Sequence, residues 1–204
     1  MIHGYHVIFG AYGFWLPNDP RGSWSDFVGK WELVRFGRTT KSVERRELTP
    51  EEEQQRIKAK RALKYPPMQF TGDQARDIGR AFGKIAARNN YTIWACSILP
   101  EHAHLVIARH TYQVESIVTL LKGESTRELI QSGSHPLAMH AKRGSRPPKM
   151  WSRGEWKVYL DSNQAIENAM RYVEENPEQD GKPKQKWRFV SPFRGIEPGW
   201  VTYH

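Results

Sequence analysis

The sequence contains a single cysteine, Cys96, and no long run of apolar residues. One cysteine cannot form an internal disulfide, nor can it supply the set of thiolates that a structural zinc site needs. No segment approaches the roughly 20 consecutive apolar residues that a membrane-spanning helix requires, and the first residues do not have the pattern of a signal peptide. We therefore expect a soluble, cytoplasmic protein that does not bind membranes.

Acidic residues are also scarce relative to basic ones. The chain has 22 Asp and Glu against 31 Lys and Arg, so its formal net charge is +9. A surplus of this kind favours a polyanionic partner such as nucleic acid, although it says nothing about the fold. Apolar residues make up 38% of the chain, too many for a disordered protein. We expect a single domain over residues 1–204.

The hydrophobic pattern divides the chain into strands and helices. Residues 5–12, 92–99, 102–109 and 156–160 are strand-like runs, whereas residues 71–89, 114–130 and 163–176 show helical spacing. Residues 14–70 are broken by proline and glycine and predict a long insertion, with one capped helix that starts after Thr49. The last helix should stop before Pro177, and a basic tail follows over residues 178–204.

Without the insertion, the predicted order is β-α-β-β-α-β plus a C-terminal helix. This is the order of an α+β, ferredoxin-like fold, in which a four-stranded antiparallel sheet carries two helices on one face. The third strand of such a sheet is an interior one, and here it begins at His102.

Two histidines open this interior strand, at positions 102 and 104. Because side chains alternate along a strand, the two imidazoles should share one face, roughly 7 Å apart along the chain. Two imidazoles on one face make half of a common divalent-metal site. Histidines that only form hydrogen bonds at the end of a sheet are the alternative. The apolar run after them favours the metal site, because it places the pair on a rigid strand.

The last predicted helix carries Tyr172 beside its apolar stripe rather than within it. Asn176 follows four residues later, one turn along the same side. A helix-packing tyrosine with a solvated hydroxyl is the common reading of such a position. Near a base or a cation, however, a phenol becomes a usable nucleophile. With a metal on His102, His104 and Asn176, Tyr172 could attack a phosphodiester.

Basic and hydroxyl side chains on the helix predicted over residues 114–130, and basic residues beside tryptophans, suit single-stranded nucleic acid with its phosphates and stacking bases. An ordinary solvated surface is the alternative for each of them. The candidate DNA-binding residues are Lys122, Ser125, Arg127, Arg143, Lys149 and Trp151. The tail repeats this composition, with Lys182, Lys184, Lys186 and Arg188 interleaved with Trp187 and Phe189.

Five motifs follow one another along the chain: Tyr5-His6-Val7-Ile8-Phe9, His102-Ala103-His104-Leu105-Val106, Lys122-Gly123 with Ser125-Thr126-Arg127, Met150-Trp151-Ser152-Arg153-Gly154 and Tyr172-Val173-Glu174-Glu175-Asn176-Pro177. Taken in this order, they resemble single-tyrosine HUH transposases, and most closely the REP-associated tyrosine transposase branch. The resemblance covers roughly residues 4–13 and 71–177, and its strength lies in the shared order of the motifs. The insertion and the tail have no counterpart in the resemblance.

The resemblance implies a metal-dependent, single-stranded DNA endonuclease and strand transferase that cleaves and rejoins DNA at hairpin or repeat sequences. Tyr172 would form a 5′-phosphotyrosine link, while His102, His104 and Asn176 would hold Mg²⁺ or Mn²⁺. It also implies single-stranded or hairpin DNA as partner, a possible homodimer, and a cytoplasmic, nucleoid-associated protein. Two other hypotheses stay open: a non-catalytic or domesticated DNA- or RNA-binding regulator, and a small-molecule phosphodiesterase that uses only the histidine pair.

Overall fold

A computed structural model describes residues 1–16 and 48–196. The predicted insertion and tail therefore lie partly outside the described residues, at positions 17–47 and 197–204. Four strands and four α-helices lie within the described part, together with a short 3-10 helix, η1. They follow one another as β1 (Gly4–Gly10), α2 (Pro50–Arg61), α3 (Gly72–Asn89), β2 (Ile93–Ile98), β3 (His102–Ala108), α4 (Val114–Gln131), η1 (Ala138–His140), β4 (Trp156–Leu160) and α5 (Asn163–Gln179).

The four strands form one antiparallel sheet in the order β2-β3-β1-β4. Strand β3 pairs with both β1 and β2, so the strand that begins at His102 is interior, as the sequence predicts. In the pairing of β1 with β3, Ile8 lies opposite His104 and His6 lies opposite Val106. The α+β, ferredoxin-like fold expected from the order of elements is confirmed.

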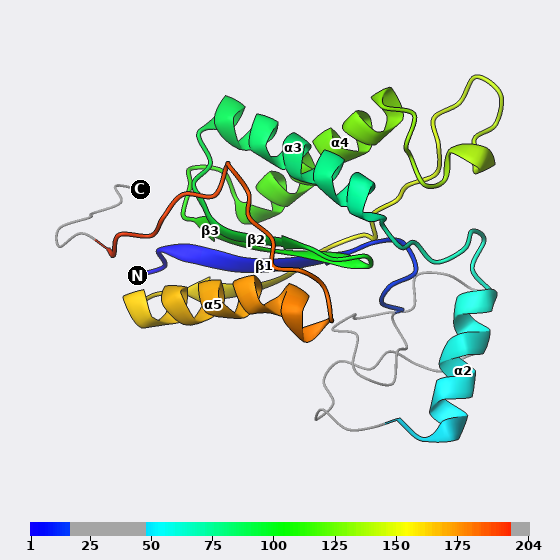
Figure 1. The fold of residues 1–204 in the computed structure, drawn as a ribbon, viewed down its shortest axis with the longest axis horizontal. Coiled ribbons are helices and arrows are strands. Elements are labelled where there is room, and N and C mark those ends of the chain that lie inside the picture. Colours follow the sequence, from blue (N-terminus) through cyan, green and yellow to red (C-terminus); the bar gives the residue numbers. More distant parts are fainter. Residues whose placement is uncertain (17–47, 197–204) are drawn as a thin grey trace.

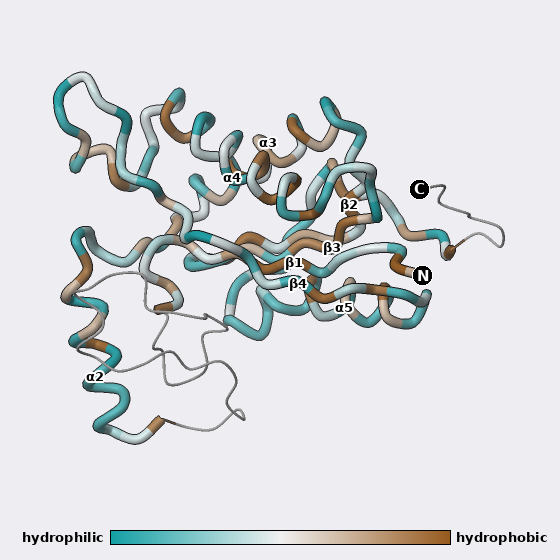
Figure 2. Tube along the Cα trace, turned by 180° about the vertical axis from the view of Figure 1, so that it is seen from behind, coloured by the Kyte–Doolittle hydropathy of each residue, from teal (hydrophilic) through white to brown (hydrophobic). Residues whose placement is uncertain are grey.

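Helices cover both faces of this sheet (Figure 1). On one face, α3 and α4 pack on strand residues such as Phe9, Leu105 and Ile107 to form the larger core. On the other face, α5 packs on a smaller cluster that includes Val106 and Leu160. Helix α2 lies apart from the sheet, and its trace is coloured mainly hydrophilic (Figure 2). None of the helices in the described ranges is long and apolar enough to cross a membrane.

Capping boxes start α2 and α3 at the positions that the sequence indicates. The Thr49 hydroxyl accepts a hydrogen bond from the backbone N–H of Glu52, and the Glu52 carboxylate accepts one from the N–H of Thr49. Thr71 and Gln74 form the same reciprocal pair at the start of α3. Each box satisfies backbone donors that the first turn of a helix cannot use, which explains where these helices begin.

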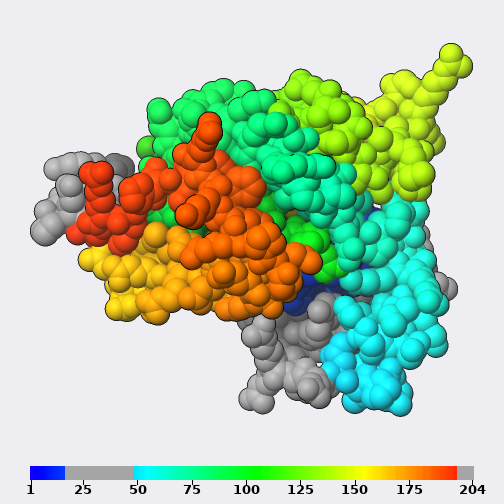
Figure 3. All heavy atoms as spheres, viewed as in Figure 1, coloured from blue at the N-terminus to red at the C-terminus, as the bar shows by residue number. Residues whose placement is uncertain are grey.

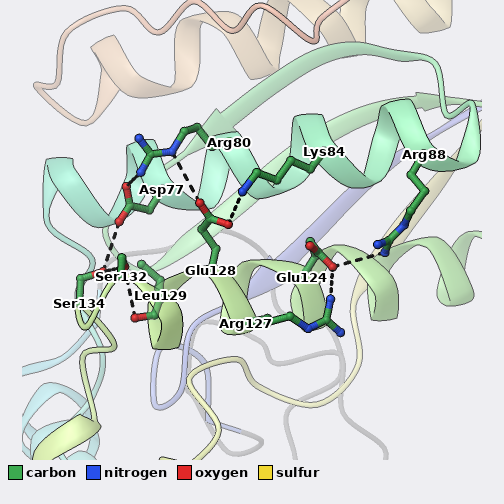
Figure 4. Close-up of polar contacts among 10 residues, drawn as sticks. All are labelled: Asp77, Arg80, Lys84, Arg88, Glu124, Arg127, Glu128, Leu129, Ser132 and Ser134. Atoms are coloured by element: carbon green, nitrogen blue, oxygen red, sulfur yellow. Dashed lines mark hydrogen bonds and ion pairs between the residues drawn. The ribbon is translucent and has the colours of Figure 1, made fainter.

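Ion pairs cross between α3 and α4 on their outer side (Figure 4). The carboxylate of Glu128 lies 2.6 Å from Nζ of Lys84 and 3.8 Å from Nε of Arg80. Glu124 pairs with Arg88 across the helices and with Arg127 along its own helix. Because the cations are well exposed, each pair contributes at most about 1 kcal/mol. The contacts therefore favour one alignment of the two helices more than they stabilise the fold.

Helix α5 does not stop before Pro177, so that prediction is wrong. Proline removes one backbone donor, but α5 ends at Gln179, and so few bonds remain that the loss is tolerated. The end is set instead by Gly181, which has a φ of 66°. The N–H of Gly181 donates to the carbonyl of Glu178, and that of Lys182 donates to the carbonyl of Pro177. This Schellman motif needs glycine at the left-handed position.

Candidate active site

Three histidines gather on the α5 face of the sheet. His102 and His104 come from β3, and the ring centroids of this pair are 4.7 Å apart. His6 comes from the neighbouring strand β1, and its ring stacks on that of His104 with centroids 5.5 Å apart. All three belong to the same set of alternating positions as Val106, which packs under α5. The imidazole pair that the sequence predicts is therefore extended by a third ring.

Tyr172 projects from α5 over two of these histidines. Its ring centroid lies 5.7 Å from that of His6 and 5.7 Å from that of His104. Val173, the next residue, is buried in the apolar cluster beneath α5. This places Tyr172 at the margin of the packed stripe, where 41% of its surface stays exposed. The structure thus brings the predicted phenol beside His104, one of the two predicted imidazoles, while leaving it accessible.

His6 is the residue that the sequence reasoning missed. Its Nε2 and the Nδ1 of His104 lie 3.2 Å apart and share a hydrogen bond. The edge of the Trp156 ring packs against it from β4, with centroids 6.2 Å apart. The sequence does contain information that points to His6, because β1 and β3 are neighbours in the predicted topology and His6 alternates with apolar residues of β1. The register that sets His6 beside His104 could not be read from either strand alone.

Burial keeps these imidazoles neutral. Desolvation lowers the pKa of His6 to about 4. It also lowers the pKa of His102 to about 4, although the nearby charges of Asp180 and Glu101 act in the opposite direction. For His104, burial and the two neighbouring histidines hold the pKa well below its usual value. Near neutral pH the ring nitrogens therefore offer lone pairs, which is the form that binds a metal.

The surroundings of His102 fit a divalent metal. The Phe14 ring stacks on its imidazole with centroids 4.6 Å apart, while its Nδ1 is buried and has no hydrogen-bond partner within the described residues. The Ser97 hydroxyl, on the β2 residue that pairs with His104, is likewise buried without a partner. Unsatisfied buried polar atoms are rare in native proteins and often mark a ligand site. Imidazole nitrogens suit transition metals such as Mn²⁺.

A third metal ligand beside His102 and His104 would have to be a residue other than His, Cys, Asp or Glu. Across residues 1–16 and 48–196, no group of three His, Cys, Asp or Glu side chains is arranged to hold a metal. Asn176, the ligand predicted from the sequence, lies half-buried on α5 one turn beyond Tyr172. An amide oxygen is an acceptable ligand for Mg²⁺ or Mn²⁺. Ligation of a metal by Asn176 stays a prediction.

The sequence profile of the family described as transposase IS200 like matches residues 56–176. This segment runs from α2 to Asn176 and contains both predicted metal-binding histidines and Tyr172. The chain belongs to this IS200-like transposase family. No curated protein matches the chain.

Two solved structures are similar at low identity. One is described as the REP associates tyrosine transposase bound to a REP hairpin; it is 14% identical over 96% of this chain and 92% of that one, with a TM-score of 0.46. The other is a candidate transposase from Deinococcus radiodurans R1, 15% identical over 85% of this chain and 90% of that one, with a TM-score of 0.40. Likenesses this distant carry no argument about function.

In this family member, three of the predicted DNA-binding residues have partners inside the protein. The Ser125 hydroxyl is fully buried, donates to the carbonyl of Leu121, and accepts a hydrogen bond from Nε1 of Trp151. Nζ of Lys122 donates to the carbonyls of Ser152 and Gly154 at 3.2 and 2.5 Å. These contacts join α4 to the segment before β4. Trp151 is buried, so the expectation that it is an exposed stacking surface is wrong.

The other three predicted DNA-binding residues are exposed. Arg127 is ion-paired with Glu124 on α4, and its side chain is still 57% exposed. Arg143 and Lys149 are exposed in the segment between η1 and β4, and part of this segment projects from the molecule (yellow-green in Figure 3). The segment 131–150 also contains η1 and the buried residue Leu137. Binding of DNA by any of the six stays a prediction.

Proposed function

We propose that the chain is a metal-dependent, single-stranded DNA endonuclease and strand transferase that acts at hairpin or repeat sequences. The observation that carries this proposal is the position of Tyr172, whose exposed ring packs against two buried, neutral imidazoles. Membership of a transposase family supports the same role. The surplus of positive charge supports a polyanionic substrate.

The proposed reaction is a transesterification at phosphorus. The phenol of Tyr172 loses its proton, and its oxygen bonds to the scissile phosphorus. The bond from phosphorus to the 3′ oxygen breaks, and this oxygen takes up a proton to become a free 3′-hydroxyl. One phosphoester replaces another, so the 5′-phosphotyrosine link stores the energy that rejoining needs. No nucleotide cofactor is required.

His102, His104 and Asn176 would hold Mg²⁺ or Mn²⁺ in this proposal. When bound, the metal would supply positive charge that polarises the phosphate and stabilises the phenolate. His6 acts on the orientation of His104: if His104 binds through Nε2, its Nδ1 carries the proton and donates to Nε2 of His6. Such a contact fixes both the tautomer and the ring orientation of a metal ligand.

The test uses a labelled single-stranded hairpin oligonucleotide, Mn²⁺ and a denaturing gel. We expect a protein–DNA adduct for the wild type, no adduct for Tyr172→Phe, and wild-type behaviour for Tyr159→Phe. Tyr159 is a matched control because it is also exposed but packs on Tyr5 instead of the histidines. The double replacement of His102 and His104 by alanine should abolish the adduct while the oligonucleotide is still retained in a native gel.

Other outcomes would support the alternative functions. Binding without an adduct, for every oligonucleotide and metal tried, would point to a regulator that only recognises nucleic acid. Hydrolysis of a small phosphodiester that survives Tyr172→Phe would indicate a phosphodiesterase that depends on the histidine pair alone.

A further inference from the structure

The segment that follows α5 runs along the edge of the sheet. The side chain of Gln185 accepts a hydrogen bond from the N–H of Ile98 and donates one to its carbonyl, both at 2.8 Å. Further on, the N–H of Ser191 donates to the carbonyl of Ile93, beside a parallel bridge between Ile93 and Val190. We call residues 182–191 the edge segment. It covers β2, whose outer backbone groups would otherwise be unpaired.

Aromatic residues of the edge segment face inward, onto α3. Trp187 packs over Gly79, where an added Cβ would lie 2.1 Å from the indole ring. Phe189 packs over Gly83, one turn further along α3, where a Cβ would lie 3.2 Å from its ring. The two glycines therefore form a groove that admits these rings. Packing half-buries both rings, so they are not the freely exposed stacking surfaces that the sequence suggests.

Cations of the edge segment face outward. Lys184, Lys186 and Arg188 are exposed and alternate with the half-buried Gln185, Trp187 and Phe189. Lys184 and Lys186 come before a turn that contains Arg188, and the hydrogen bond from the N–H of Val190 to the carbonyl of Trp187 closes this turn. Within residues 1–16 and 48–196, no carboxylate forms an ion pair with any of the three. The result is a row of unneutralised positive charges held on a rigid support.

This row starts at the end of the sheet where the histidines lie. Gln185 is bonded to Ile98, and Ser97, the residue before it, pairs with His104. The row then continues along β2, on the surface between α3 and α5 (Figure 3). A single strand whose phosphate lies at Tyr172 would therefore find positive charge along this edge. The family match ends at Asn176, before the edge segment begins.

We propose that Lys184, Lys186 and Arg188 bind the phosphate backbone of the single-stranded DNA that flanks the bond at Tyr172. This inference rests on the proposed function, because it names the path of the same substrate. The exposed residues of the edge segment are all cations except Pro183 and Ser191, so the segment should bind any sequence equally. Its role is to hold and direct the strand, while recognition of a target belongs elsewhere on the protein.

The first experiment removes the charges. The variant Lys184→Gln/Lys186→Gln/Arg188→Gln and the wild type are compared by fluorescence anisotropy on labelled oligothymidylate over a range of salt concentrations. Each phosphate contact contributes about 0.7 to the slope of log K against log salt for single strands, so three contacts predict a slope smaller by about 2. The control is Lys58→Gln/Arg61→Gln/Lys64→Gln, which removes the same charge from exposed positions on or just after α2. It should leave the slope close to that of the wild type.

The second experiment moves the charges without removing them. Gly79→Ala forces Trp187 out of its groove, so we expect faster hydrogen exchange at the Ser191 amide and weaker binding of oligothymidylate. Gly123→Ala on α4 is the matched control, because an added Cβ there meets nothing within 4 Å. This variant should bind as the wild type does.

Adduct formation at Tyr172 is measured on the same preparations, which separates the two proposals. If the adduct forms normally and the triple variant and the wild type have equal slopes of log K against log salt, the role of the edge segment is refuted and the cleavage reaction is not. A smaller slope with no adduct from any protein would support that role and refute the cleavage reaction. If the wild type does not bind oligothymidylate or a hairpin at all, both proposals fail.

Discussion

On the face of the sheet that α3 and α4 cover, the strands contribute apolar side chains such as Phe9, Leu105 and Ile107, all almost fully buried. On the face that α5 covers, the same strands contribute apolar residues at one end and three histidines at the other. Two buried polar atoms there, Nδ1 of His102 and Oγ of Ser97, have no hydrogen-bond partner in the described part of the chain. Groups of this kind cost free energy when they are left unsatisfied.

The difference between the two faces indicates that one stabilises the fold and the other carries the candidate active site. One face buries enough apolar surface to stabilise the fold, so the other can hold polar groups that would weaken a core. Helix α5 closes the second face and carries its own apolar stripe next to Tyr172. The comparison predicts that substitutions on the two faces will have opposite consequences for stability and activity.

The largest effect is expected for Phe82→Ala, on the α3 side. Phe82 is fully buried and packs edge-on against Phe9 with ring centroids 6.0 Å apart. Removing a buried phenyl ring leaves a cavity and should lower the free energy of unfolding by about 3–5 kcal/mol. Urea denaturation measures this loss. Leu120→Ala, at an exposed position on α4, should change it by less than about 0.5 kcal/mol.

Adduct formation per folded molecule should be unchanged in Phe82→Ala at temperatures where the variant stays folded. A loss of activity in folded protein would contradict the division between the faces, because it would show that the apolar side positions the site directly.

His6→Phe tests the other face and should have an intermediate effect. Phenylalanine keeps the ring contacts with His104 and Tyr172 but cannot accept the hydrogen bond from His104. We expect the Kd for Mn²⁺ to rise about 10- to 100-fold, with little change in unfolding free energy. Calorimetric titration measures the affinity.

His6→Gln should recover part of this affinity for Mn²⁺, because an amide oxygen can accept the same hydrogen bond from Nδ1 of His104. His140→Phe, at an exposed histidine of η1, is the control and should bind Mn²⁺ as the wild type does. Equal affinities for all four proteins would mean that His6 only fills space.

Lys122→Met tests the α4 side through the pH dependence of stability. Burial lowers the pKa of Lys122 to about 8, against the opposing influence of Glu155. Between pH 8 and the usual pKa of a lysine, the unfolded chain holds a proton that the folded chain has lost. The wild type should therefore gain stability relative to the methionine variant as pH rises, by about 1.4 kcal/mol per pH unit.

Paired urea titrations at several pH values measure this difference, since other groups titrate alike in both proteins. The prediction fails if the difference in unfolding free energy between the two proteins stays constant from pH 7 to pH 10, or if the wild type loses stability relative to the variant. Either result would mean that the ammonium group keeps its charge among the carbonyls of Ser152 and Gly154.

Much of the fold was predictable because its signals are local. Capping boxes at Thr49 and Thr71 specify helix starts through contacts within four residues. The order of strands and helices then restricts the topology to a ferredoxin-like sheet with β3 inside. The wrong prediction at Pro177 has a physical reason. The destabilisation by a proline depends on how many helical hydrogen bonds lie beyond it, and the Schellman motif at Gly181 ends α5 shortly after Pro177.

The candidate site was predictable only in part. His102, His104 and Tyr172 could be selected because strand and helix periods assign each side chain to a face. His6 could not, since its role depends on the pairing of β1 with β3. The same limit explains Trp151 and Trp187: composition shows tryptophan beside cations, but only packing shows whether the ring faces solvent or a groove.

By itself the sequence determined the family, the order of elements and the residue types that the chemistry needs, because these follow from spacing along the chain. Only the tertiary structure decided which of these residues meet. Strand register brings His6 to His104, the packing of α5 brings Tyr172 over both, and the glycine groove of α3 turns the cations of the edge segment outward. Each of these outcomes depends on contacts between segments far apart in the chain, which no local pattern contains.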